Sequence, residues 1–244
     1  MQHPFIKLII AHTECHQTLS ERIISNAVLP YCRDIHHYID NVNGGKNLSF
    51  EESNDITWTR CIYQTVQAMD FLHRPNASVR GPIFFRALTS QNILLDENFN
   101  VRIGDFGLAV EVKQNDAHAI LNNVMTTEGY HHPNMNLHEY SASYNTFSIG
   151  VVMLEILTAT EAILDEDNHY PYGKYKCKRG HERLIDDLDV RAAYIKTSGW
   201  RNKDKRNRFA KIALQAADSD YNQRMKTITI LSKLLFISLK SSKN

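Results

Sequence analysis

The sequence is poor in the residues that mark several specialised protein classes. Its 244 residues contain only four cysteines, which stand far apart and form no CxxC pair. They are Cys15, Cys32, Cys61 and Cys177. This pattern argues against a disulfide framework and against a four-thiolate zinc site, and it favours reduced thiols in the cytoplasm.

Long apolar runs are also missing. The longest, such as residues 149–157, are much shorter than the ~20 residues that cross a bilayer, so we expect no membrane insertion. Residues 5–11 are interrupted by Lys7, and no small-residue cleavage site follows them. We therefore expect no secretory signal, which again favours the cytoplasm.

Neither sign of charge is in excess. The chain has 28 Lys and Arg against 27 Asp and Glu, a formal net charge of +1. The chain therefore lacks the large net positive charge that favours binding to nucleic acid or an anionic membrane, so we expect protein partners. Hydrophobic residues make up 43% and charged residues 23%, which excludes a wholly disordered or fibrous chain. The length suits one domain, or at most a domain and a half.

The first half of the chain is predicted to combine short strands with one long helix. Residues 5–11 and 22–29 have the pattern of a two-stranded hairpin. Thr57 is expected to cap a helix whose apolar stripe faces a core. The stripe consists of Trp58, Ile62, Val66, Met69 and Leu72. Short strands are predicted at 93–95 and 101–103, on either side of a turn.

The second half is predicted to be mainly helical. A polar segment without clear periodicity, residues 111–144, precedes a helix over 147–157 that is apolar on nearly every side and belongs in the middle of a domain. A polar loop over 165–182 is followed by helices near 207–217 and 225–239. Alone, this order of elements indicates an α+β fold.

One stretch of the sequence carries a family resemblance. It contains Phe85-Arg-Ala-Leu88, then Asn92, then Asp105-Phe-Gly107. These residues resemble the catalytic loop, H-R-D-L-x-x-x-N, and the metal-binding D-F-G loop of the protein kinase family. A lone DFG tripeptide is a weak signal, but here the flanks match as well. Residues 126–134 are similar to the end of that family's activation segment, and residues 147–158 to its central buried helix.

The resemblance covers nearly the whole chain and implies a protein-kinase-like fold. Residues 1–33 would be a remnant of the N-terminal lobe, with its fourth and fifth strands and the hinge, and residues 34–240 the helical C-terminal lobe. The pattern over 212–224 is similar to that of the interleukin-1-receptor-associated/Pelle kinases and the plant receptor-like kinases, in the tyrosine-kinase-like group. No GxGxxG occurs in the sequence, so we expect no glycine-rich phosphate loop.

Several positions depart from the family pattern in ways that bear on catalysis. Ala87 stands where the family has its catalytic Asp and offers no proton acceptor, while Arg86 is retained. Thr89 stands where serine/threonine kinases commonly have Lys, which removes a positive charge from the transferred phosphoryl group. Asn92 and Asp105 remain at the family's Mg²⁺-binding positions. Two such ligands without a phosphate cradle would hold Mg²⁺ and ATP weakly, and the alternative is that both only stabilise their loops.

Other departures concern the anchoring of the loops. Asn134 stands where the family's A-P-E pattern has Glu, and Asn145 where its buried helix has Asp, so both charge-assisted links are weakened. Arg224 is the candidate partner of the first position, and we expect it to lack an ionic partner. Phe85 replaces a His, but its ring can still stack beneath Phe106.

Zinc-type ligands gather near the beginning of the sequence. His12, Cys15 and His16 stand close together, with His36 and His37 nearby in sequence. The competing interpretation is a solvated loop, because 12 histidines are spread over the whole chain.

We interpret the chain as a pseudokinase-like domain that binds protein partners, kinases or adaptors, as a signalling scaffold or regulatory decoy. Phosphoryl transfer and a cofactor are not expected. The alternative is a serine/threonine protein kinase represented by a fragment, and a third interpretation is a truncated product with no stable fold. Ala87 separates the first two better than chain length does, because adding residues cannot repair the substitution.

Overall fold

The structure is a computed structural model that describes residues 33–43, 55–75, 81–113, 116–121, 127–131, 139–162, 172, 180–194, 200 and 202–239. The strands expected at 5–11 and 22–29, the rest of the N-terminal remnant up to residue 32, and Asn134 lie outside the described residues.

The helices of the described residues are α3 (Ile35–Asn43), α4 (Asp55–His73), α5 (Ala142–Thr158), α6 (Gly180–Tyr194), α7 (Lys203–Ala216) and α8 (Thr227–Leu239). The strands are β1 (Arg33–Asp34), β2 (Ile83–Phe84), β3 (Ile93–Leu95), β4 (Val101–Ile103), β5 (Val110–Glu111), β6 (His118–Ile120) and β7 (Glu139–Ser141), and a 3-10 helix, η1, spans Ser90–Asn92.

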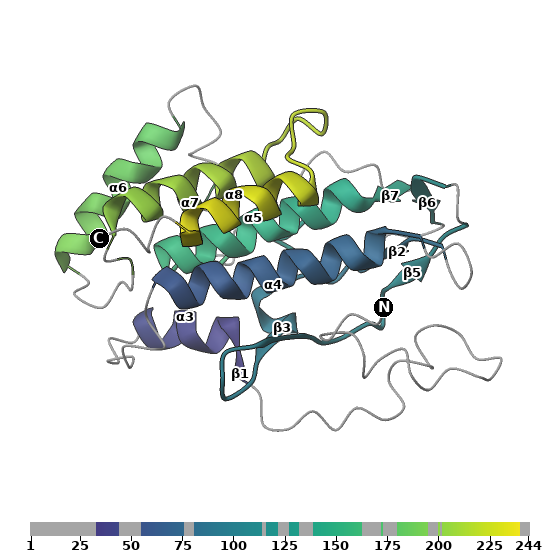
Figure 1. Ribbon diagram of the computed structural model, residues 1–244, viewed down its shortest axis with the longest axis horizontal. Helices are drawn as coiled ribbons and strands as arrows, with labels where there is room; N and C mark the ends of the chain where they lie inside the picture. The colour runs from purple at the N-terminus through teal and green to yellow at the C-terminus, as the bar shows by residue number, and fades with distance from the viewer. Residues whose placement is uncertain are drawn as a thin grey trace.

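The long helices form the body of the molecule. Helix α5 packs against α4, α6 and α7, and α8 packs against α4 and α7 (Figure 1). Strands β1, β3 and β4 form an antiparallel sheet beside α3 and α4, while the pairs β2–β5 and β6–β7 gather near the beginning of α5 (Figure 1). None of the described helices has both the length and the apolar character that a membrane crossing requires. The arrangement confirms the expected α+β fold.

Helix α4 confirms the predicted apolar stripe, because all five of its residues are buried. The helix begins at Asp55 rather than after Thr57, which is buried within the first turn. A carboxylate in the first turn interacts favourably with the helix dipole. The Asp55 carboxylate also forms a nearly buried ion pair with Lys205 Nζ of α7, at 3.1 Å. The predicted cap at Thr57 is therefore wrong, because the helix begins three residues earlier than a cap at this position implies.

The predicted hairpin at 93–95 and 101–103 is confirmed as β3 and β4. These strands pair antiparallel with Ile93 opposite Ile103. The turn between them is shaped by the Asp96 carboxylate, which accepts backbone N–H groups from within the turn. The register brings the residue before β3 next to the residue after β4, which positions the candidate site described below.

The segment 111–144, which has no clear periodicity in the sequence, contributes residues to three short strands. Strand β5 pairs with β2, and β6 pairs with β7, with Ala119 opposite Tyr140. Each of these strands is only two or three residues long. A strand of that length is too short for alternation between apolar and polar residues to become visible in the sequence.

Helix α5 confirms the predicted central helix and begins five residues earlier than 147. Every residue from Asn145 to Thr158 is buried, so the helix has no solvent face. That burial explains why its sequence is apolar on nearly every side. The few polar side chains within this span must find their partners inside the protein.

Two helices, α3 and α6, were not predicted, and α7 begins earlier than predicted. Both unpredicted helices are rich in polar residues, and the packing of a few apolar side chains stabilises them. Helix α7 begins at Lys203, where the Asn202 side chain accepts the Lys205 N–H at 3.0 Å. Helix α8 confirms the prediction over 225–239 to within two residues.

Close packing of α5 on α7 depends on Gly150. A Cβ atom at this position would lie 2.4 Å from the Ala217 backbone nitrogen and 2.8 Å from the Ala213 carbonyl oxygen. We expect Gly150→Ala to force the two helices apart and to lower the free energy of unfolding in urea by about 1–3 kcal/mol. Gly104→Ala is the control, because the nearest neighbour of its Cβ would be the flexible Leu94 side chain, at 3.3 Å, and the nearest backbone atom would lie at an ordinary contact distance of 3.8 Å. Equal midpoints for the two variants would contradict the prediction.

Candidate active site

The loop of residues 85–92 connects β2 to β3 and has a fixed backbone. Arg86 adopts a left-handed conformation with φ 67°, which is uncommon for a residue with a side chain. The Ala87 N–H donates to the Phe85 carbonyl at 2.9 Å. At the other end, Thr89 caps η1, and its Oγ1 accepts the Asn92 N–H at 3.3 Å. The loop is thus closed by its own hydrogen bonds.

Ala87 lies at the centre of this loop and is only 3% exposed. Its carbonyl oxygen accepts a hydrogen bond from Asn92 Nδ2 at 2.7 Å. The side chain at this position is a methyl group, which can neither accept nor orient a proton. Thr89, where the family pattern has a cation, is also buried, and its hydroxyl serves the backbone of η1. Neither position therefore offers a charged group to a substrate.

Asp105 follows β4 and lies close to Asn92. The Gly104 N–H donates to the Asn92 carbonyl at 2.9 Å, so the two candidate metal ligands belong to neighbouring backbone segments. The Asp105 side chain is exposed, and its Oδ1 accepts the Gly107 N–H at 3.3 Å. Its backbone has φ 54°, a second left-handed residue at this site. Each of the two residues thus stabilises its own loop.

The donor atoms at this site suit a magnesium ion. The carboxylate of Asp105 and the amide oxygen of Asn92 are hard oxygen ligands, and the bond to Ala87 uses the Asn92 nitrogen rather than its oxygen. These two residues would hold Mg²⁺, which would supply charge to bound phosphates. The residues present therefore fit the metal ion, whereas the sequence contains no glycine-rich loop for the phosphates.

Aromatic packing connects the two loops. The Phe85 ring contacts the Phe106 ring edge-to-face, with centroids 4.8 Å apart, and both residues are buried. The predicted stacking of these rings is confirmed. Arg86 Nη1 donates to the Leu108 carbonyl at 3.2 Å, and burial lowers the pKa of this guanidinium. The retained arginine thus joins the loop to the segment after DFG.

Asn145 of α5 holds the beginning of the loop in place through hydrogen bonds. Its Oδ1 accepts the Phe85 N–H at 3.3 Å and His73 Nε2–H at 3.0 Å, while its Nδ2 donates to the Tyr140 hydroxyl at 3.3 Å. Burial lowers the pKa of His73, so this imidazole stays neutral. An uncharged residue at 145 therefore keeps the backbone bond that was predicted for it.

A second anchor on α5, Glu155, was not identified from the sequence. Its side chain is fully buried, and Oε1 accepts the Tyr130 hydroxyl at 2.7 Å and the Ala162 N–H at 3.3 Å. The Ser90 hydroxyl lies 2.8 Å from that of Tyr130 and 3.4 Å from Oε1. Ser148 fixes the same segment by donating to the Tyr130 carbonyl at 2.8 Å. In the sequence, the signal that could have identified this anchor was the single carboxylate in an otherwise apolar helix.

Arg224 is held without a carboxylate in the part of the chain that the structure describes. Its Nε donates to the Asp218 carbonyl at 2.8 Å, and its Nη1 donates to the Ser143 carbonyl and hydroxyl at 3.1 Å. The guanidinium also lies over the Phe147 ring, 5.2 Å from its centroid. Among the described residues, carbonyl groups, a hydroxyl and an aromatic ring therefore hold the guanidinium, whereas Asn134, at the position of its candidate partner, lies outside them.

The Glu155 anchor makes a prediction about pH. Burial raises the pKa of this carboxyl to about 8, and the nearby Glu161 charge acts in the same direction. Because the folded pKa lies above the unfolded value, the carboxyl contributes most to stability at acid pH, and this contribution is lost as pH rises towards about 8. We expect the unfolding free energy to fall by a few kcal/mol between pH 5 and 9 relative to Glu155→Gln. Parallel pH profiles for the two proteins would contradict this expectation.

Comparison with known proteins agrees with the geometry. A family model described as the protein kinase domain matches residues 1–236. A probable LRR receptor-like serine/threonine-protein kinase of Arabidopsis thaliana is 30% identical over 175 residues, which cover 68% of this chain and 19% of that protein. Serine/threonine-protein kinase PBS1 of the same plant is 32% identical over 140 residues, covering 57% of this chain and 29% of its own length.

A third relative, wall-associated receptor kinase-like 15 of Arabidopsis thaliana, is 37% identical over 133 residues, or 52% of this chain and 20% of that protein. The matched part of the chain thus spans less than a third of the length of each of these relatives. Together with the paired catalytic and DFG loops beside a buried α5, the match over residues 1–236 shows that the chain belongs to the protein kinase family.

Proposed function

We propose that this chain is a pseudokinase domain, which retains the kinase fold but does not transfer phosphate. The observation that carries the proposal is the buried methyl group of Ala87 at the centre of the loop. Losing a general base typically costs roughly 10²–10⁴ in rate. Thr89 adds an independent loss, because its hydroxyl is bonded within η1 and provides no positive charge for a phosphoryl group.

A domain of this kind can still bind other proteins. Helix α5 contacts the loop near both ends, at Phe85 through Asn145 and at Ser90 through Glu155, so a surface of kinase shape would be kept without the chemistry. The near-zero net charge suits protein partners, kinases or adaptors, rather than nucleic acid. We propose a signalling scaffold or regulatory decoy in the cytoplasm, where the buried free thiol of Cys61 is compatible with reducing conditions.

The second candidate function is phosphoryl transfer by a serine/threonine kinase of which this chain is a part. Two observations favour it: Asn92 and Asp105 present oxygen ligands suited to Mg²⁺, and the similar proteins carry the names of serine/threonine kinases. On this account phosphate-binding elements outside the chain would complete the site. The proton acceptor at position 87 would still be missing.

Phosphate incorporation from labelled ATP with Mg²⁺ distinguishes the two functions. We expect no incorporation into a generic protein substrate or into the chain itself, for the unmodified protein and for Asp105→Ala alike. Activity in the unmodified chain that disappears in Asp105→Ala would contradict the pseudokinase proposal, because that result requires metal-assisted transfer at this site.

Nucleotide binding is measured separately by thermal shift. A ligand at about 100 times its dissociation constant stabilises the folded state by about 2.7 kcal/mol. We expect no shift with millimolar Mg²⁺ and ATP, because two metal ligands without a phosphate cradle bind too weakly. Asp96→Ala is the matched control for Asp105→Ala, since Asp96 lies in the β3–β4 turn.

A further inference from the structure

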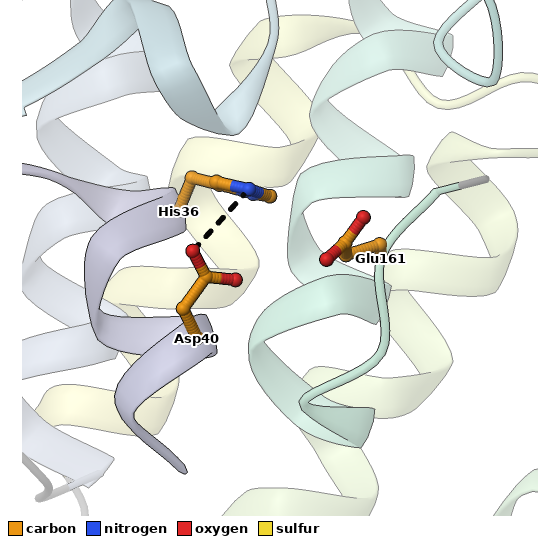
Figure 2. A group of neighbouring side chains, drawn as sticks. All are labelled: His36, Asp40 and Glu161. Carbon is orange, nitrogen blue, oxygen red and sulfur yellow. Dashed lines mark ion pairs between the residues drawn. The ribbon is translucent and has the colours of Figure 1, made fainter. Parts of the chain in front are cut away.

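Three metal-ligand side chains that belong to neither candidate loop converge between α3 and the end of α5. His36 and Asp40 lie one turn apart on α3, and Glu161 follows the end of α5 (Figure 2). His36 Nε2 lies 3.6 Å from Asp40 Oδ2, and one ligand atom from each of the three residues lies within 4.8 Å of the other two. The Glu161 carboxylate faces the pair across the space between the two elements (Figure 2).

The backbone that carries these side chains is fixed by contacts of its own. In α3, the Asp34 carboxylate accepts the His37 N–H at 2.7 Å at the beginning of the helix, and Ile35 and Ile39 are buried. The spacing of four residues puts His36 and Asp40 on one face, as in helical metal motifs.

Glu161 is positioned from the other side. Helix α5 ends at Thr158, and the next residue, Ala159, has φ 47° and a left-handed backbone. The Ala162 N–H then donates to the buried Glu155 carboxyl at 3.3 Å. A residue between these two fixed points has little freedom in its backbone, so the approach of Glu161 to α3 follows from the fold rather than from a mobile loop.

The charges of the cluster are not balanced within the described part of the chain. Two carboxylates face one imidazole, and neither carboxylate forms an ion pair with a lysine or arginine among the described residues. His36 Nδ1 is buried and has no hydrogen-bond partner there. All three side chains remain accessible enough for an ion to enter, with 21% of the His36 and 51% of the Asp40 side chain exposed. A cation would offset the excess negative charge.

We propose that His36, Asp40 and Glu161 bind a divalent transition-metal ion, with Zn²⁺ as the expected ion. Zinc accepts imidazole nitrogen and carboxylate oxygen together, and sites with three protein ligands leave a fourth position for water. The imidazole disfavours Mg²⁺ and Ca²⁺, which prefer oxygen ligands alone. The bound ion joins α3 to the turn after α5. The proposed site uses neither Asn92 nor Asp105 as a ligand, so the test of zinc binding is independent of the proposed function.

The competing explanation is a simple i,i+4 ion pair between His36 and Asp40, with Glu161 near it by chance. That explanation requires no affinity for zinc. A second competitor is the group His12, Cys15 and His16, which lies outside the described residues. The test must therefore separate these two groups of ligands.

The experiment titrates Zn²⁺ into the full 244-residue chain by calorimetry and repeats the titration with Co²⁺, whose visible absorption reports its coordination. We expect one ion per chain. His36→Ala and Glu161→Gln should each weaken binding at least about tenfold. His37→Ala is the matched control on the same helix, and it should bind as the unmodified chain does. Far-UV circular dichroism establishes that each variant is folded, and Glu161→Gln gives the test should His36→Ala not fold.

Two outcomes would overturn the proposal. One is the absence of zinc binding by the unmodified chain at millimolar concentration. The other is zinc binding that survives in Glu161→Gln and is lost when His12 and His16 are replaced by Ala, which would assign the ion to the other group. Loss in Glu161→Gln with retention in the His12 and His16 variant supports the proposed site.

Discussion

Because α5 is buried on all sides, its polar side chains must find partners within the protein. A buried polar group without a hydrogen bond costs about 1–3 kcal/mol, and a buried charge costs more. Asn145 and Oε1 of Glu155 meet this constraint by bonding to the loop after β2 and to Tyr130, whereas the buried Oε2 of Glu155 has no hydrogen-bond partner among the described residues. The position of the loop therefore depends on the hydrogen bonds that the buried polar side chains of α5 must form.

This dependence explains how the fold and the chemistry can be separated in one protein. The bonds that position the loop come from the backbone, from Asn92 and from Asn145, and none of them involves the side chain at position 87. Ala87 therefore offers no proton acceptor, in a loop whose supporting bonds do not use the side chain at this position. The proposed scaffold of kinase shape without a base is compatible with this geometry.

The parts of the fold that the sequence predicts are those with local signals. Periodicity predicts helix α4, and turn residues predict the β3–β4 hairpin. A continuous apolar run predicts the buried helix α5. Helices α3 and α6 are polar and owe their stability to distant partners, so periodicity did not identify them. Motif spacing placed Asn92 and Asp105 together, whereas the contacts of Glu155 with Ser90 and Tyr130 join residues 65 and 25 positions apart, which no local pattern reveals.

Helix α5 holds the loop of residues 85–92 in place without using the side chain at position 87. Hydrogen exchange at the Phe85 amide measures this most directly, in the unmodified chain and in Asn145→Leu, with Thr158→Val as a control on the same helix. We expect slow exchange at Phe85 in the unmodified and control proteins. In Asn145→Leu we expect exchange at least about fivefold faster, because a hydrogen bond worth about 1 kcal/mol is lost. Equal exchange at Phe85 in all three proteins would contradict it.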